Sequence, residues 1–128
     1  MYGNLMENSF GKYLSTKRLS KHISLRLFAK KIGISATYLS KIENGLKPAP
    51  KSLVLEKMIE ILMLESNEID VFYDLAAKTK GDTFLAVDLV KYINDNEIIH
   101  STLRLSKRCN VSSTDWQDIY KLFYEKYL

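Results

Sequence analysis

The feature of this sequence that most restricts its fold is a pair of short helical segments on either side of Gly33. A serine precedes each segment, at Ser24 and at Ser35, and serine is a favoured N-cap because its hydroxyl accepts a main-chain N–H. Gly33 can end the first helix in the left-handed conformation, and Asn44 with the glycine after it can end the second. Two helices of about nine residues joined by so short a turn form a helix-turn-helix unit. We predict this unit over residues 24–44.

Three further helices are predicted around this unit, because apolar residues recur there at three- and four-residue spacing. One helix begins after Ser9, one follows the loop 46–50 with Pro50 in its first turn, and one follows Asn67. With the two helices above they make a five-helix domain, which we place at residues 1–78.

The remaining residues predict a helical extension, so the expected fold class is all-α. Residues 78–83 are the expected linker. Helical patterns follow at 84–93 and 100–107, and a last helix starts at Ser112, where Asp115 completes a capping box.

The last helix carries an apolar stripe, through which the extension at residues 79–128 is expected to self-associate. The stripe comprises Trp116, Ile119, Tyr120, Phe123 and Tyr127. Aromatic residues are enriched in interface cores, which favours a homodimer interface. Packing against the protein's own core explains the same spacing equally well, and the pattern does not separate the two alternatives.

Charge is divided unevenly along the chain. Residues 1–64 contain eleven Lys or Arg and four Asp or Glu, a net charge of +7, whereas residues 65–128 contain eight basic and eleven acidic residues, a net charge of −3. A basic half is typical of a chain that meets a polyanion, although solvated helix faces give the same imbalance. The acidic balance of the second half argues against its lying along DNA.

Composition argues against several other classes of protein. No apolar run approaches the roughly 20 residues that span a membrane, and residues 1–10 lack the apolar core of a signal peptide. A single cysteine, Cys109, fits a reducing cytoplasm. His22 and His100 have no partners at metal-ligand spacing, and no catalytic constellation is present. We expect a cytoplasmic protein that is not an enzyme and uses no metal or cofactor.

The run from residue 23 to residue 45 resembles the phage-repressor-like (XRE) helix-turn-helix family, and the resemblance extends over residues 10–78. The matching segments are Phe28-Ala29, Gly33-Ile34-Ser35 and Leu39-Ser40-Lys41-Ile42-Glu43-Asn44-Gly45. The resemblance implies a lambda-repressor-like domain that binds double-stranded DNA with the second helix of the unit in the major groove. It also implies a buried structural ion pair between Arg18 and Glu43.

Two sets of DNA-contacting residues follow from the resemblance. Base edges are expected to meet Ala36, Thr37, Ser40 and Lys41. Phosphates are expected near Ser24, Leu25, Ser35, Tyr38, Asn44, Lys47 and Lys51. Base contacts select the sequence, with Lys41 suited to guanine O6 and N7, whereas phosphate contacts only position the protein.

Three positions depart from the family pattern. Leu25 stands where the family commonly has Gln, so the side-chain contact with a phosphate is lost there. Leu27 occupies a position that is usually polar and is either exposed or packed on the extension. Met63 stands where the family often has Gly to end a helix, so this connection is expected to be built differently.

The resemblance predicts a transcriptional regulator, most simply a repressor that binds a palindromic operator as a homodimer. One alternative on the same fold is the antitoxin of a toxin–antitoxin pair, whose C-terminal half would hold a protein partner. A second alternative is an interaction adaptor that does not read DNA. A generic helical bundle with a coincidental turn is disfavoured, because spacing, turn residues and charge agree.

Overall fold

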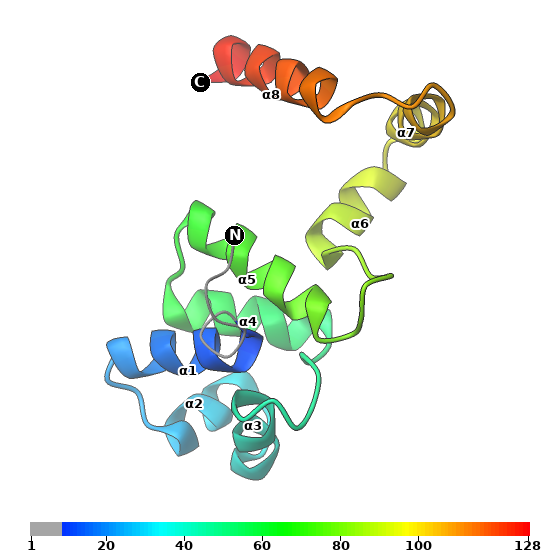
Figure 1. Cartoon of the computed structure of the whole chain (residues 1–128). Coiled ribbons are helices and arrows are strands. Elements are labelled where there is room, and N and C mark those ends of the chain that lie inside the picture. The colour runs from blue at the N-terminus through cyan, green and yellow to red at the C-terminus, as the bar shows by residue number, and fades with distance from the viewer. Residues whose placement is uncertain (1–8) are drawn as a thin grey trace. The chain divides into compact units, whose positions relative to one another are not determined.

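A computed structural model describes residues 9–128, which form eight α-helices and no strand (Figure 1). This confirms the predicted all-α class. The described chain divides into two compact units, with the boundary after Leu89. The expected domain boundary was Lys78, and its first eight residues lie outside the described part. The first unit extends further because Ala86 is buried and Val87 packs against the core. No helix within residues 9–128 is long and apolar enough to cross a bilayer.

The N-terminal unit is built from five helices and the start of a sixth. They are α1 (Phe10–Ser20), α2 (Leu25–Ile32), α3 (Ala36–Glu43), α4 (Ser52–Leu62) and α5 (Ser66–Lys78). Helix α1 packs against α3 and α5, while α2 packs against α3 and α4. Helix α3 lies at the end of this unit away from α5 (Figure 1). The five helices predicted from the sequence are therefore present.

Serine side chains cap the first three helices, as predicted. The hydroxyl of Ser9 accepts the N–H of Lys12 at 3.2 Å. The hydroxyls of Ser24 and Ser35 each accept an N–H three residues on, at 3.1 Å in both cases. Each bond satisfies one of the main-chain donors that a helix start leaves open, so these local signals fix where the helices begin.

Two predicted helix starts are wrong. Helix α4 begins at Ser52, and Pro50 lies before its first turn, because Thr79 Oγ1 accepts the N–H of Ala49 at 2.8 Å and holds this loop extended against α5. Helix α5 begins at Ser66, since a capping box forms one turn earlier than expected. In that box the Glu68 side chain accepts the N–H of Glu65 at 3.1 Å.

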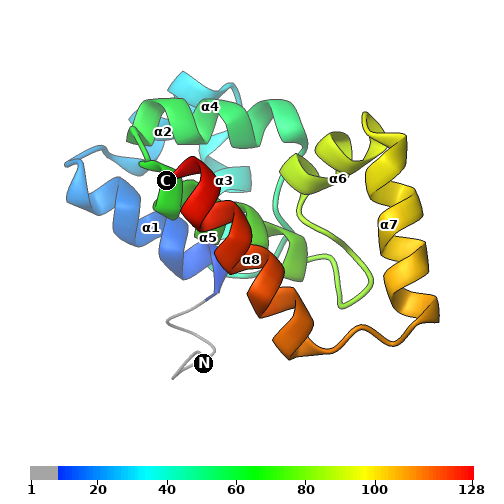
Figure 2. The same ribbon diagram turned by 90° about the horizontal axis from the view of Figure 1, so that it is seen from above.

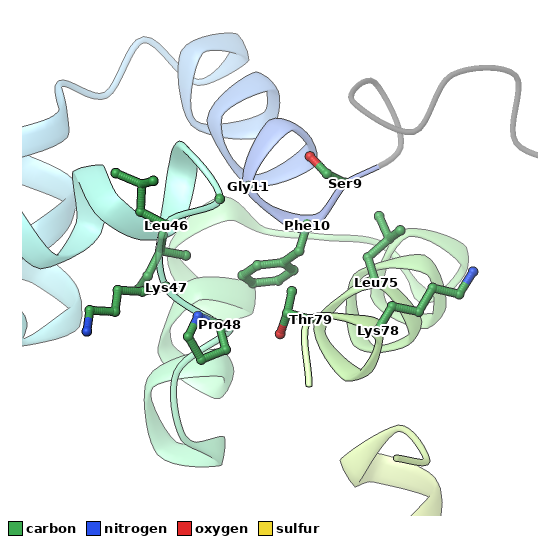
Figure 3. Close-up of a pocket in the computed structure, with 11 residues that line it drawn as sticks. Ser9, Phe10, Gly11, Leu46, Lys47, Pro48, Leu75, Lys78 and Thr79 are labelled. Atoms are coloured by element: carbon green, nitrogen blue, oxygen red, sulfur yellow. The ribbon is translucent and has the colours of Figure 1, made fainter. Parts of the chain in front are cut away.

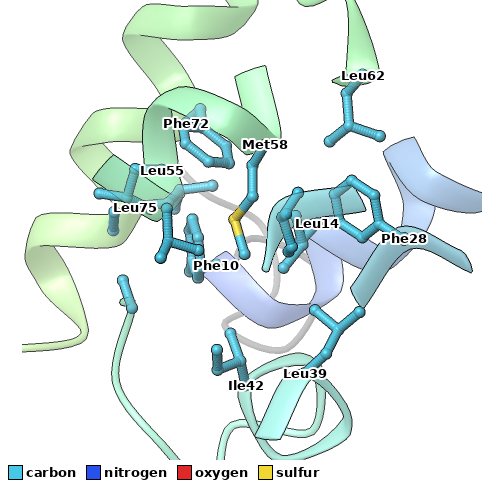
Figure 4. Close-up of a cluster of buried hydrophobic side chains, with 14 of the residues drawn as sticks. Phe10, Leu14, Phe28, Leu39, Ile42, Leu55, Met58, Leu62, Phe72 and Leu75 are labelled. Carbon is cyan, nitrogen blue, oxygen red and sulfur yellow. The ribbon is translucent and has the colours of Figure 1, made fainter. Parts of the chain in front are cut away.

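The core of the N-terminal unit draws on all five helices (Figure 4). Phe28, Met58 and Phe72 are fully buried in it, and the Phe10 and Phe72 rings lie 5.1 Å apart in a tilted arrangement. An ion pair between Lys17 and Glu68 ties α1 to α5 at the surface, and Lys17 lowers the pKa of the Glu68 carboxyl. Hydrophobic burial on this scale supplies the main stabilising force, on the order of 2 kcal/mol for each large side chain.

The C-terminal unit consists of the rest of α6 (Val87–Asn94) with α7 (Glu97–Arg108) and α8 (Ser113–Tyr127). The predicted capping box of α8 is confirmed, since Ser112 Oγ accepts the N–H of Asp115 at 3.1 Å and the Asp115 carboxylate accepts the N–H of Ser112 at 3.2 Å. Helix α7 starts three residues before the predicted helical stretch, where Glu97 favours the positive N-terminal end of the helix dipole. Figure 2 shows α7 and α8 as two rods joined by a short connection.

Met63 ends α4 in the left-handed conformation, with φ 51° and ψ 48°. This is the conformation that glycine adopts freely and that costs other residues roughly 1–2 kcal/mol. The connection is therefore built as in a chain with glycine here, which corrects the expectation of a different build. The Met63 side chain is 69% exposed and contributes little packing to offset the strain.

Met63→Gly should accordingly stabilise the protein, by about 1 kcal/mol, because it removes the steric cost of a β-carbon in this conformation. The free energy of unfolding from urea titrations followed by circular dichroism measures the effect. Met63→Ala is the matched control, since it shortens the side chain but keeps the β-carbon. An equal gain in both variants would show that the side chain, and not the backbone conformation, is responsible.

Candidate nucleic-acid interface

The turn between α2 and α3 is held by main-chain hydrogen bonds. Gly33 takes a positive φ of 78°, and the N–H of Ile34 bonds to the carbonyl of Ala29 at 3.0 Å. Ala29 is 2% exposed, so its small side chain lies at the packed contact inside the unit. The angle between the two helices is thereby fixed without any contribution from exposed side chains.

Helix α3 has one buried and one exposed side. Leu39 and Ile42 are fully buried and hold the helix to the core, whereas Thr37 and Lys41 are exposed on the other side. Ser40 is half-buried, and its hydroxyl accepts the Asn44 side-chain amide at 3.3 Å. Ala36 also packs partly against the core. Of the four residues predicted to meet bases, Thr37 and Lys41 thus project furthest.

The start of α2 is the first predicted phosphate-binding element. The Ser24 hydroxyl already accepts the N–H of Leu27, so the N–H groups of Leu25 and Arg26 are the donors that lack a helical acceptor. Leu25 packs its side chain partly against the core, leaving only its main chain for an anion. Leu27 is 45% exposed, which answers the question its apolar character raised.

Arg26 was missed by the sequence reasoning. Its side chain is exposed in the first turn of α2, one residue after the position where the family commonly has Gln. A cation is unfavourable at the positive end of a helix dipole unless an anion binds beside it. A basic residue in the first turn of the first helix of such a unit was the signal available in the sequence.

The loop that follows α3 carries Lys47. The N–H groups of Leu46 and Lys47 both bond to the carbonyl of Lys41, at 2.8 and 3.3 Å, so the loop folds back on the end of α3. Lys47 and Lys51 are exposed on either side of the buried residues Ala49 and Pro50. Tyr38 and Ser35 complete the predicted phosphate set, half-buried and exposed respectively at the start of α3.

A cavity of about 450 Å³ lies between this loop, the start of α1 and the end of α5 (Figure 3). Phe10 and Leu75 contribute to its apolar wall. The Thr79 hydroxyl, beside the cavity, accepts the N–H of Ala49 and donates to the carbonyl of Ala76 at 2.7 Å. Thr79 therefore positions the lysine-bearing loop from α5, a role that its place in the predicted linker did not suggest.

The expected ion pair between Arg18 and Glu43 is present and links α1 to the end of α3. The two side chains form paired hydrogen bonds of 2.8 and 2.9 Å, and Arg18 Nη1 donates to the carbonyl of Ile23 at 2.9 Å. Arg18 is 8% exposed, and its hydrogen bonds to Glu43 raise the pKa of its guanidinium. A bidentate pair of this kind fixes the direction of α3 as well as its position.

Gly11 is a second contact between α1 and α3, and the sequence reasoning did not identify it. A β-carbon at this position would lie 2.4 Å from the carbonyl oxygen of Glu43 and 2.5 Å from that of Ile42. The two helices therefore approach as closely as main chains can. The available signal was a glycine inside a predicted helix, which often marks such an approach.

No group of three or more His, Cys, Asp or Glu side chains within residues 9–128 is placed to hold a metal ion. What the N-terminal unit does present is a short helix fixed on its inner side, exposed on its outer side and flanked by basic residues. This is the geometry of a DNA-binding helix-turn-helix domain.

Comparison with known proteins agrees. A family model described as helix-turn-helix matches residues 14–68. The ImmF control region 10 kDa protein of Bacillus phage phi105 is 37% identical over 78 residues, which cover 54% of this chain and 86% of that protein. The chain belongs to the phage-repressor-like (XRE) helix-turn-helix family and is a DNA-binding transcription regulator. A chain in a solved SinR protein/SinI protein complex is 25% identical, with 92% of this chain and 95% of that chain covered at a TM-score of 0.45.

Removing one partner of the Arg18–Glu43 pair should cost about 3–5 kcal/mol, because the remaining charge is left buried without a partner. The variants Arg18→Met and Glu43→Leu test this in denaturant titrations, with Lys21→Met as an exposed control on the same helix. The double variant Arg18→Met/Glu43→Leu should lose much less than the sum of the two single losses. Additive losses would mean that the two side chains stabilise the fold independently.

Proposed function

We propose that this protein is a cytoplasmic repressor that binds a palindromic operator as a homodimer, with α3 in the major groove. The observation that carries the proposal is the two-sided character of α3, which is anchored by Leu39, Ile42 and the Glu43 ion pair and exposes Thr37 and Lys41. The major groove, about 12 Å wide, admits one α-helix presented in this way.

Within this proposal the α3 residues have different roles. Lys41 donates to guanine O6 and N7, and the Thr37 methyl contacts a thymine methyl. Ser40, held by Asn44, offers its hydroxyl at the edge of the reading surface, and Ala36 permits close approach because its side chain is small. These four residues select the sequence.

A second group of residues positions the protein on the sugar–phosphate backbone. Main-chain N–H groups at the start of α2, next to Ser24 and Leu25, face one phosphate, and Arg26 adds the charge that a Gln side chain would not. Ser35, Tyr38 and Asn44 flank the reading helix. Lys47 and Lys51 contact the backbone from the loop after it. Contacts of this kind are sequence-independent and fix the register of the protein on the duplex.

The homodimer is supported by the exposed side chains of α8. Tyr120 is 71% exposed, Tyr127 is 70% exposed and Phe123 is 58% exposed. A two-fold protein matches a two-fold operator, because each reading helix then meets an equivalent half-site. The same exposed face also favours a second candidate, an antitoxin that autoregulates its operon and whose extension binds a small toxin protein.

Lys41→Ala should lose about 1–3 kcal/mol of binding free energy at one base pair and relax the preference there. Lys47→Ala should instead weaken every duplex about equally and reduce the salt slope by about 1, since it removes one phosphate contact. Titrations of labelled operator variants at several salt concentrations measure both. Identical behaviour of the two variants across all duplexes would show that Lys41 does not read bases.

The operator is tested by selecting bound duplexes from a random pool. The proposed function predicts an inverted repeat whose half-sites are centred about 10 base pairs, or one helical turn, apart. A single unrepeated site would exclude the palindromic homodimer. Weak binding of every duplex with no dependence on salt would exclude DNA reading altogether, since log K should fall linearly with log salt. Co-purification of a small toxin with the extension would favour the antitoxin instead.

A further inference from the structure

The C-terminal unit has helices but no core of its own. Within residues 90–128 no side chain is buried. A unit of roughly 40 residues seldom folds stably without disulfides, a metal or a partner. Its one cysteine, Cys109, is exposed and unpaired. The well-formed helix caps of this unit therefore require stabilisation from something that covers its apolar side chains.

Those apolar side chains form one continuous face, which also divides the predicted stripe into two parts. Trp116, Ile119 and Phe123 line an open groove of about 390 Å³ between α8 and α7. The second part, Tyr120, Tyr124 and Tyr127, continues the face around α8, and the Tyr120 and Tyr124 rings stack at 6.3 Å. The stripe is thus broader than the sequence spacing indicated.

The size of this face matches what a stable protein interface needs. Five aromatic side chains of α8 are between 37% and 71% exposed. At roughly 200 Å² for each fully exposed aromatic side chain, they present about 600 Å² of accessible surface. Exposed Tyr92 and Ile98 extend it toward the roughly 800 Å² that one partner contributes to a standard interface. This exceeds the scattered apolar exposure that is normal for a monomer.

The charges of the unit favour a second copy as the partner. Residues 90–128 contain six basic and five acidic residues, so two copies repel each other little. Along α8 the first half carries Asp115 and Asp118, whereas the second half carries Lys121, Glu125 and Lys126. An antiparallel pair of α8 helices places the acidic half of each against the more basic half of the other. A two-fold axis produces this antiparallel arrangement, because each copy then contributes the same surface.

We propose that a second copy of this chain covers the apolar face of residues 90–128, with the two α8 helices antiparallel, and that this unit folds stably only in the pair. This proposal rests on the proposed function, which requires a homodimer, and it names the surface and couples the folding of that surface to assembly. Because unfolded chain is favoured by dilution, operator occupancy then depends on protein concentration more steeply than for a preformed dimer.

The only tryptophan of the chain, Trp116, lies in this groove, so its fluorescence reports on the C-terminal unit alone. Urea titrations of the full chain over about a hundredfold range of concentration should move the Trp116 midpoint upward with concentration. Sedimentation equilibrium on the same samples should show monomer converting to dimer over the same range. A concentration-independent Trp116 midpoint would overturn the coupling of folding to assembly.

Tyr120→Glu places a charge on the exposed face and should shift the dimer toward monomer by at least about tenfold in Kd, because the charge would be buried in the pair. Gln117→Glu is the matched control on the exposed opposite side of α8 and should leave the mass unchanged. Far-ultraviolet circular dichroism verifies that the N-terminal unit stays folded in both. An unchanged dimer in Tyr120→Glu would overturn the proposed surface while leaving the dimeric repressor intact.

The orientation is tested with Cys109→Ser chains that carry one new cysteine, either Thr114→Cys or Lys126→Cys. A short thiol cross-linker should join a Thr114→Cys chain to a Lys126→Cys chain and should not join like chains, whereas a parallel pair would give the reverse. DNA titrations on the same proteins separate the two proposals. A dimer that binds no DNA sinks the proposed function alone, and a monomer that binds DNA with a salt slope sinks the inference on the C-terminal unit.

Discussion

The paired hydrogen bonds between Arg18 and Glu43 are the interaction on which the N-terminal unit most depends. They join the helix that opens the fold to the end of the helix that faces outward, and a third bond from Arg18 to the carbonyl of Ile23 fixes the entry to α2. A buried ion pair contributes less to net stability than its geometry suggests, because desolvation offsets much of the attraction. Its main effect is to allow one arrangement of the three helices, which a DNA-reading surface requires.

Local chemistry explains why much of this fold could be predicted from the sequence. Ser24, Gly33 and Ser35 each satisfy main-chain groups within three or four residues, so the positions of α2 and α3 follow from short-range rules. The ends of α4 and α5 depend on distant partners instead. The Thr79 hydroxyl holds the loop before α4, and no spacing rule within that loop reveals it. The predicted first turn at Pro50 failed for this reason.

The candidate interface divides in the same way. The family pattern placed Thr37 and Lys41 on the outer side of α3, where the structure exposes them. It did not reveal that Ser40 is bonded to Asn44 or that Arg26 stands beside the position of the missing Gln. The apolar stripe of α8 was recognised, but its spacing could not distinguish a core from an interface. That distinction depends on what surrounds the helix, and helical periodicity records only that one side is apolar.

Gly11 has a consequence for how far the reading helix stands out from the body of the protein. The main chain of α1 sets a floor beneath the last turn of α3, and any β-carbon would have to move from 2.4 Å to at least the 3.4 Å at which ordinary contact begins. A relative with alanine or serine at this place must carry its third helix about an ångström further out, or end it sooner. Residue 11 therefore acts as a depth gauge for groove entry, although it lies on a different helix and touches no base.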